Sequence, residues 1–317
     1  MAGALTMFPF SSEEVQKHFV SAEELMRACD QVWSVDRRSP IKLERGQPRA
    51  GSCLYCKVDH LIGLFDQLRL VRNRVVLVSS ESDRPITREF LERCPPQVAH
   101  WFSTNVQARD ERLSALPLGL ANSYCDITLK APLIAAHSRL FAERSHWLYV
   151  NFRTTSNPAV RESAMHYFRS LGEPDWVTVQ EAGRDFEGFL GEMTMHRFAL
   201  CPPGNGIDTH RLWEALYSRT IPVALAHPAM DGFRDLPILF VEDFRQLTRD
   251  FLAREYERIT SSRWTWQKLF VPWWRDRIRD QQEKLKDENA MLPRSEFLRE
   301  IARTRLAALK RRVLRKS

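Results

Sequence analysis

The chain has 317 residues, a length that suits two ordinary domains better than one. Hydrophobic residues make up 44% of it and charged residues 27%, which excludes a disordered chain because ample apolar surface is available for a core. No apolar run approaches the roughly 18 residues of a transmembrane helix, and the first residues lack the basic and apolar regions of a secretory signal. We therefore expect a cytoplasmic protein.

The net charge of +7 is concentrated at the C-terminal end. Residues 294–317 contain nine basic and two acidic residues, a difference that equals the excess of the whole chain. The remainder is neutral, so the composition does not indicate a uniformly basic nucleic-acid-binding fold. We expect no nucleic-acid partner.

The six cysteines are scattered along the chain. Cys53 and Cys56 form a lone CxxC, without a second pair or the two histidines of a zinc finger. Reduced, buried thiols are the interpretation that fits a cytosolic protein. We therefore predict no metal site and no cofactor.

The N-terminal half has a less regular pattern than the rest. We expect helices at 12–29 and 87–94, strands at 53–56, 74–80 and 98–103, and a strand end that turns into a loop at 116–120. These elements fit an α/β unit with a boundary near 140–146.

From residue 147 onward, strands and helices alternate. Strands are predicted at 147–152, 176–179, 198–201, 221–225 and 238–241, and helices at 158–170, 185–195, 208–218 and from an Asp243 cap to about 256. This alternation favours a parallel, doubly wound sheet, in which ligands bind beyond the carboxyl ends of the strands. Past residue 261 the chain is rich in Trp and then helical and charged.

The segment 198–223 carries the strongest functional signal. An apolar strand leads through Pro202-Pro203 into the turn Gly204-Asn205-Gly206, and a helix capped by Asp208 or Thr209 follows. Glycines allow unusual backbone geometry and close approach of a ligand, and a helix N-terminus attracts anions. We therefore predict an anion site at this turn.

Arg211 and Glu214 share one face of that helix because they are three residues apart. The guanidinium can grip a diphosphate, and the carboxylate can accept two ribose hydroxyls. An exposed ion pair worth only a few tenths of a kcal/mol is the alternative. The spacing is neither that of a P-loop nor that of a dinucleotide-binding fingerprint.

The segment CPPGNGIDTHRLWEALYSRTIPV resembles the donor-binding signature of exostosin-like glycosyltransferases. The resemblance implies a GT-B fold, in which two Rossmann-like, doubly wound α/β domains face a cleft. The corresponding ranges are an acceptor-side domain at 1–145, a nucleotide-sugar-binding domain at 146–260 and a helical extension at 261–317. Arg219 stands where the family has Gly, and a left-handed conformation there costs an Arg on the order of 1 kcal/mol.

The activity implied is transfer of a sugar from a nucleotide sugar to a glycan or lipid-linked acceptor. Arg211 is assigned to the diphosphate and Glu214 to the ribose. The chain has no Asp-x-Asp, so fixed cations rather than a metal ion are expected to stabilise the leaving diphosphate. The predicted donor-binding residues are Arg153, Gly204, Asn205, Gly206, Thr209, His210, Arg211 and Glu214. Arg161 is either a further phosphate contact or a solvated helix residue.

Inversion at the sugar also needs a general base for the acceptor hydroxyl. Asp59, His60 and Asp83 follow predicted strands and are the candidates, and for each of them a cap or turn residue is the alternative. His60 and His210 can also be structural histidines.

The tail combines an apolar stripe with flanking basic residues. This pattern is typical of a helix on an anionic membrane surface, and packing against the N-terminal domain is the alternative. Peripheral association with the inner face of a membrane follows from the first interpretation. The alternative function is a non-catalytic, membrane-associated protein that binds a nucleotide or a glycan.

Overall fold

The computed structural model describes residues 8–39, 47–125, 131–137, 144–172, 174–183 and 185–303. The chain divides into two compact units. The larger unit comprises Met1–Glu24 and Ala115–Trp273, and the smaller unit comprises Leu25–Ser114 and Trp274–Ser317. The units thus combine segments from both halves of the sequence, and the domain ranges 1–145, 146–260 and 261–317 stay a prediction.

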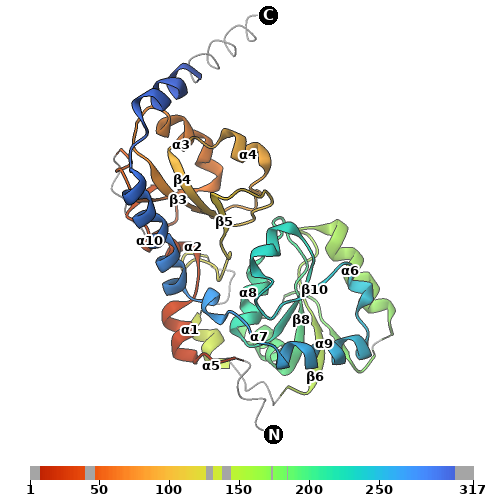
Figure 1. Cartoon of the computed structure of the whole chain (residues 1–317). Helices are drawn as coiled ribbons and strands as arrows, with labels where there is room; N and C mark the ends of the chain where they lie inside the picture. Colours follow the sequence, from red (N-terminus) through yellow and green to blue (C-terminus); the bar gives the residue numbers. More distant parts are fainter. Residues whose placement is uncertain are drawn as a thin grey trace, which may run out of the picture. The chain divides into compact units, whose positions relative to one another are not determined.

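The larger unit is built on a parallel five-stranded sheet (Figure 1). Its strands are β6 (His146–Val150), β7 (Val177–Val179), β8 (His196–Leu200), β9 (Ile221–Leu225) and β10 (Leu239–Val241), in the spatial order β10-β9-β8-β6-β7. All four neighbouring pairs are parallel. The strand order reverses between β6 and β8, which makes the sheet doubly wound, as the alternation predicted.

Helices surround this sheet in Figure 1. They are α6 (Pro158–Ser170), α7 (Phe186–Met195), α8 (His210–Tyr217) and α9 (Arg249–Ser261), with 3-10 turns at Pro228–Phe233, Phe244–Gln246 and Trp266–Leu269. Asp243 caps the turn at Phe244–Gln246 rather than a helix, because its side chain accepts from the Arg245 N–H. The helix α9 begins later and is capped by Thr248. The predicted helix start at Asp243 is therefore wrong.

The single helix expected at 12–29 is two helices, α1 (Ser12–His18) and α2 (Ala22–Arg27). The helix α1 begins at a capping box formed by Ser11 and Glu14. The chain leaves helical geometry before Val20, whose N–H donates to the Tyr217 hydroxyl and whose carbonyl accepts from the Leu120 N–H. Tertiary contacts have replaced the hydrogen bonds of a continuous helix. A further helix, α5, spans Ala131–His137.

The smaller unit also contains a five-stranded sheet. Its strands are β1 (Gln31–Ser34), β2 (Cys53–Lys57), β3 (Val75–Ser80), β4 (Val98–Ser103) and β5 (Leu113–Ala115), and they lie in chain order. The pairs from β1 to β4 are parallel. The other elements are α3 (Leu61–Leu68), α4 (Arg88–Arg93), α10 (Val271–Glu288) and a 3-10 turn at Val58–His60. The strand β1 and the helix α3 were not predicted.

Two five-stranded sheets whose strands alternate with helices confirm the predicted mixed α/β class. Of the cysteines in the described segments, Cys53, Cys56 and Cys201 are buried and the others are partly buried. The Sγ atoms of Cys29 and Cys53 lie 3.1 Å apart. No helix of the described residues is long and apolar enough to cross a membrane. The predicted amphipathic tail lies largely outside the described residues, which end at 303.

Arg219 has a left-handed backbone with a φ of 62°. This is the conformation that glycine adopts most easily, and the family signature has Gly at this position. It follows the C-cap of α8, where the Arg219 and Thr220 N–H groups donate to the carbonyls of Leu216 and Ala215. This pair of bonds is a Schellman motif, which requires a left-handed residue at that position. The Arg219 guanidinium donates to the Phe10 carbonyl at 2.8 Å and lies 5.7 Å from the Phe10 ring.

Gly119 is a position where the larger unit tolerates no side chain. Its φ is +68°, and a Cβ there would lie 2.0 Å from the Val20 carbonyl oxygen. We expect Gly119→Ala to lower the free energy of unfolding by about 2–4 kcal/mol, because strain and overpacking add. Thermal and urea unfolding of the purified protein measure this loss.

Gly63 is the matched control, because it lies within α3 and a Cβ there meets no atom within 4 Å. Gly63→Ala should stabilise the protein by about 0.5–1 kcal/mol through helix propensity. Equal unfolding midpoints for the two variants would contradict the packing at Gly119.

Candidate functional site

A cavity of about 460 Å³ lies in the larger unit, beyond the carboxyl ends of its strands. It is bordered by the segments that follow β6 and β8, the two strands between which the strand order reverses. In open α/β sheets this reversal is the place where ligands bind. Its walls come from four regions, and the lining residues are Asn151, Arg153, Thr155, Ser156, Arg161, Ala182, Gly183, Phe186, Phe189, Arg211 and Glu214.

The Arg211 guanidinium is held in the cavity by two neighbours. One Nη donates to the Asn151 carbonyl, and the guanidinium carbon lies 4.3 Å from the centre of the Phe189 ring. The buried Nε has no hydrogen-bond partner among the described residues. Stacking and one hydrogen bond therefore fix the group, while donor capacity remains for a ligand.

Glu214 lies beside Arg211 as the three-residue spacing predicted. The Arg211 Nε and a Glu214 carboxylate oxygen are 3.7 Å apart, and the two side chains are 24% and 9% exposed. An exposed surface pair, the alternative interpretation, does not describe this burial. Both side chains line the same cavity.

Arg161 has a structural task. Its guanidinium donates to the carbonyls of Pro203, Pro202 and Arg153 at 2.9, 3.1 and 2.9 Å, and to the Ser156 hydroxyl at 2.6 Å. Burial, and secondly the charge of Arg211, lower the pKa of Arg161. Four of its five N–H donors are used inside the protein, so it is not the solvated helix residue that was the alternative. Arg161 also lines the cavity, and its contact with a phosphate stays a prediction.

The glycines of the turn do not provide left-handed backbone, because neither Gly204 nor Gly206 has a positive φ. At Gly204 space is tight, since a Cβ there would lie 3.1 Å from the Arg161 Nη2, which would have to shift by a few tenths of an ångström. Its N–H donates to the Gly206 carbonyl, and its carbonyl accepts from the Asn157 side chain. Asn205 is exposed. These three residues are not among those that line the cavity.

Residues at the start of α8 form hydrogen bonds with the loop at 116–120 of the same unit. The buried Asp208 carboxylate accepts from the Leu118 N–H at 2.8 Å and from the Trp213 indole at 2.6 Å. The His210 Nδ1 donates to the Gly119 carbonyl at 2.8 Å. Thr209 occupies the N-cap position without a side-chain hydrogen bond to the helix. Asp208 and His210 therefore anchor the loop at 116–120. For His210 this is the structural role that the sequence analysis gave as the alternative to donor binding.

Of the predicted donor residues, the cavity therefore brings together Arg153, Arg211 and Glu214. The Arg153 side chain is exposed and makes no ion pair or hydrogen bond within the described part of the chain. Sequence reasoning missed Phe186 and Phe189. Their three-residue spacing after a strand end was visible, but an aromatic pair on a helix usually packs into the core.

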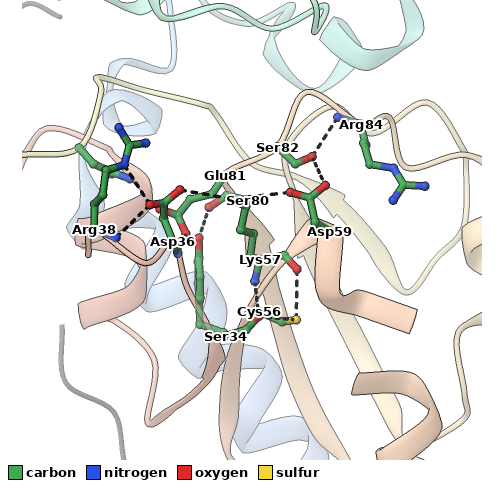
Figure 2. Close-up of polar contacts among 12 residues, drawn as sticks. Ser34, Asp36, Arg38, Cys56, Lys57, Asp59, Ser80, Glu81, Ser82 and Arg84 are labelled. Atoms are coloured by element: carbon green, nitrogen blue, oxygen red, sulfur yellow. Dashed lines mark hydrogen bonds and ion pairs between the residues drawn. The ribbon is translucent and has the colours of Figure 1, made fainter. Parts of the chain in front are cut away.

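The candidate bases lie at the carboxyl edge of the smaller unit's sheet, where Figure 2 shows the side chains of three strand ends. Asp59 accepts from the Ser82 hydroxyl at 2.9 Å, and its other oxygen lies 3.7 Å from the Lys57 Nζ. Lys57 also lies 3.4 Å from Asp36. Hydrogen bonds from Arg38, and secondly Lys57, hold the pKa of Asp36 at about 2.

The other two candidate bases, His60 and Asp83, follow the strands β2 and β3. His60 is exposed at the N-cap position of α3 and makes no capping hydrogen bond with its side chain. Asp83 is exposed and has no partner among the described residues. The described residues contain no group of three or more His, Cys, Asp or Glu side chains that could hold a metal ion.

No family model matches the chain, and no curated protein matches it significantly. Among solved structures, it is similar to an α1,3-fucosyltransferase, with 13% identity over 76% of this chain and 78% of that chain and a TM-score of 0.41. An α1,3-fucosyltransferase with GDP-fucose has 12% identity over 84% and 95% of the chains and a TM-score of 0.38. A UDP-forming α,α-trehalose-phosphate synthase from Burkholderia xenovorans has 12% identity over 80% and 73% and a TM-score of 0.35. At such identities the likeness concerns the fold.

Substitutions of Arg153 and Arg161 should have different effects, the first on ligand binding and the second on the stability of the fold. Arg161→Ala leaves several carbonyls without their donor, so we expect the free energy of unfolding to fall by more than about 2 kcal/mol. Arg153→Ala removes an exposed side chain and should change it by less than about 0.5 kcal/mol, while weakening the binding of inorganic pyrophosphate. Urea unfolding and calorimetric titration measure both quantities. A destabilised Arg153→Ala protein would contradict the assignment.

Asp208 should make stability depend on pH. Burial raises its pKa from 3.8 to about 7, although its hydrogen bonds oppose this shift. Between about pH 4 and 7 the folded protein therefore holds a proton that the unfolded chain releases, and this contribution to stability is lost as the pH rises. Urea unfolding at several pH values should show that Asp208→Asn removes this component. An unchanged pH dependence in the variant would refute it.

Proposed function

We propose that the protein is an exostosin-like glycosyltransferase of GT-B architecture that transfers a sugar from a nucleotide sugar to a glycan or lipid-linked acceptor. The observation that carries the proposal is the pair Arg211 and Glu214, which lie 3.7 Å apart in the cavity at the strand-order reversal. A cation and a carboxylate at this separation suit a phosphate and the neighbouring ribose. We assign Arg211 to the diphosphate and Glu214 to the ribose hydroxyls.

In the proposed reaction, the bond between the sugar C1 and the diphosphate oxygen breaks. A bond from the acceptor oxygen to C1 forms, and the acceptor proton moves to a base. Negative charge then grows on the departing nucleoside diphosphate. Arg211 is already held by Phe189 and Asn151, so it can stabilise this charge without reorganising. Arg153 adds a second cation at the mouth, and we propose that no metal ion takes part.

The general base is proposed to come from the smaller unit. Of the three candidates, Asp59 has the most firmly oriented side chain, because its carboxylate accepts from the Ser82 hydroxyl. His60 and Asp83 remain the other candidates. A base must reach the acceptor hydroxyl directly or through one water, so the variants Asp59→Asn, His60→Ala and Asp83→Asn are ranked by turnover and not by donor binding.

The second candidate is a non-catalytic protein that binds a nucleotide or glycan and associates with a membrane surface. Two observations favour it: both oxygens of Asp59 already have partners, and the basic excess of the chain lies in 294–317. A cytoplasmic location and peripheral association with a membrane surface are proposed for both candidates. Binding of nucleotide sugars without hydrolysis or transfer is the result that would favour it.

Turnover should depend on the two central side chains. We expect Arg211→Ala and Glu214→Ala each to reduce transfer or donor hydrolysis at least about 100-fold, because each removes a charged contact to the donor. A panel of nucleotide sugars is assayed for nucleoside diphosphate release, with and without EDTA. Thermal unfolding verifies that the variants are folded.

Arg245→Ala is the matched control, since Arg245 is an exposed arginine that forms an ion pair with Asp243 on the same turn. It should keep full activity. If both cavity variants keep the activity of the unaltered protein, the donor assignment fails. Loss of activity in EDTA that Mg²⁺ restores would refute the metal-independent mechanism.

A further inference from the structure

The first turn of α7 places two aromatic side chains on the wall of the cavity. Phe186 and Phe189 are three residues apart, which puts them on one face of the helix about 4.5 Å apart along its axis. Phe189 is 7% exposed and lies under the Arg211 guanidinium. Phe186 is 36% exposed and stacks on no other ring of the described residues. The Phe189 ring thus supports the Arg211 guanidinium, and the Phe186 ring is exposed to solvent.

The space beside Phe186 is also open. Gly183 lines the same part of the cavity, and a Cβ built on it would meet no atom within 4 Å. The neighbouring lining residue, Ala182, contributes only a methyl group. Phe186 is thus a large exposed apolar ring next to unfilled space, one helical turn from the ring that supports Arg211. This is unusual for a surface that meets only water. A flat ligand group has room to lie against this ring.

We infer that Phe186 is the stacking surface for the nucleobase of the donor, an inference that rests on the proposed function. In a nucleoside diphosphate, the ribose separates the base from the phosphates. With the phosphates at Arg211 and the ribose at Glu214, the base lies farther along the cavity wall, where Phe186 provides the aromatic face. Phe186 thus determines the preference for nucleotides over inorganic phosphates.

Recognition by stacking is tolerant, because every base has a π-face. Among the lining residues on this side, Ala182, Gly183 and Phe186 have no side-chain donor or acceptor to distinguish one base from another. Phe186 therefore increases the affinity for guanine and uracil nucleotides alike. Discrimination between them comes from another part of the site.

The test compares three probes, GDP, UDP and inorganic pyrophosphate, by calorimetric titration of the full chain and its variants. Phe186→Ala should weaken binding of both nucleotides about 5- to 150-fold, as expected for loss of one base–aromatic stack. Binding of pyrophosphate should not change, because Arg211 is untouched. Phe186→Trp should restore nucleotide binding. Leu70→Ala, which removes another exposed apolar side chain, is the control and should bind all three probes normally.

The outcomes separate this inference from the proposed function. If the unaltered protein and Phe186→Ala bind the nucleotides equally tightly, the inference is wrong while the diphosphate site stands. An equal loss of pyrophosphate binding would show that Phe186 acts on the phosphate site and would also overturn it. If the unaltered protein binds none of the probes, the proposed function fails and the inference fails with it.

Discussion

The cavity of the larger unit depends on the hydrogen bonds that the Arg161 guanidinium makes across the strand-order reversal. Pro202 and Pro203 follow β8 and have no N–H groups, and their carbonyls turn toward α6 and accept from Arg161. The same guanidinium also holds the loop after β6, because it donates to the Arg153 carbonyl and the Ser156 hydroxyl. One side chain thus joins the loop after β6, which lines the cavity, to the segment after β8, which leads into the helix that carries Arg211 and Glu214.

This arrangement concentrates positive charge. Arg161 and Arg211 are close enough that the charge of Arg211 contributes to lowering the pKa of Arg161, after burial. Glu214 is the one acidic side chain among the cavity's lining residues, against three arginines. A bound anion would relieve this repulsion and gain from the partly desolvated surroundings, where electrostatic interactions are stronger than in water. The charge balance therefore favours a phosphate ligand, independently of any family resemblance.

Sequence patterns were sufficient where a property is local. The helix at 158–170 and the strand at 221–225 have the predicted bounds, and the three-residue spacing correctly placed Arg211 beside Glu214. Roles that depend on distant partners were not predictable. Asp208 was predicted as a possible helix cap and His210 as a donor-binding residue, but both hydrogen-bond to a loop about 90 residues earlier in the chain. The exposure of Phe186 could not be foreseen either, because periodicity does not distinguish a core ring from one that lines a cavity.

Arg219 illustrates how tertiary contacts can compensate for an unfavourable local choice. The Schellman motif at the end of α8 demands a left-handed residue, and an arginine there is strained by on the order of 1 kcal/mol. A hydrogen bond to the Phe10 carbonyl and the nearby Phe10 ring offset this strain. The first turn of α8 is held in turn by Asp208 and His210 against the loop at 116–120. Because α8 is anchored at both ends, Arg211 and Glu214 project from a helix that has little freedom to shift, which is the condition for a preorganised charge to act on a ligand.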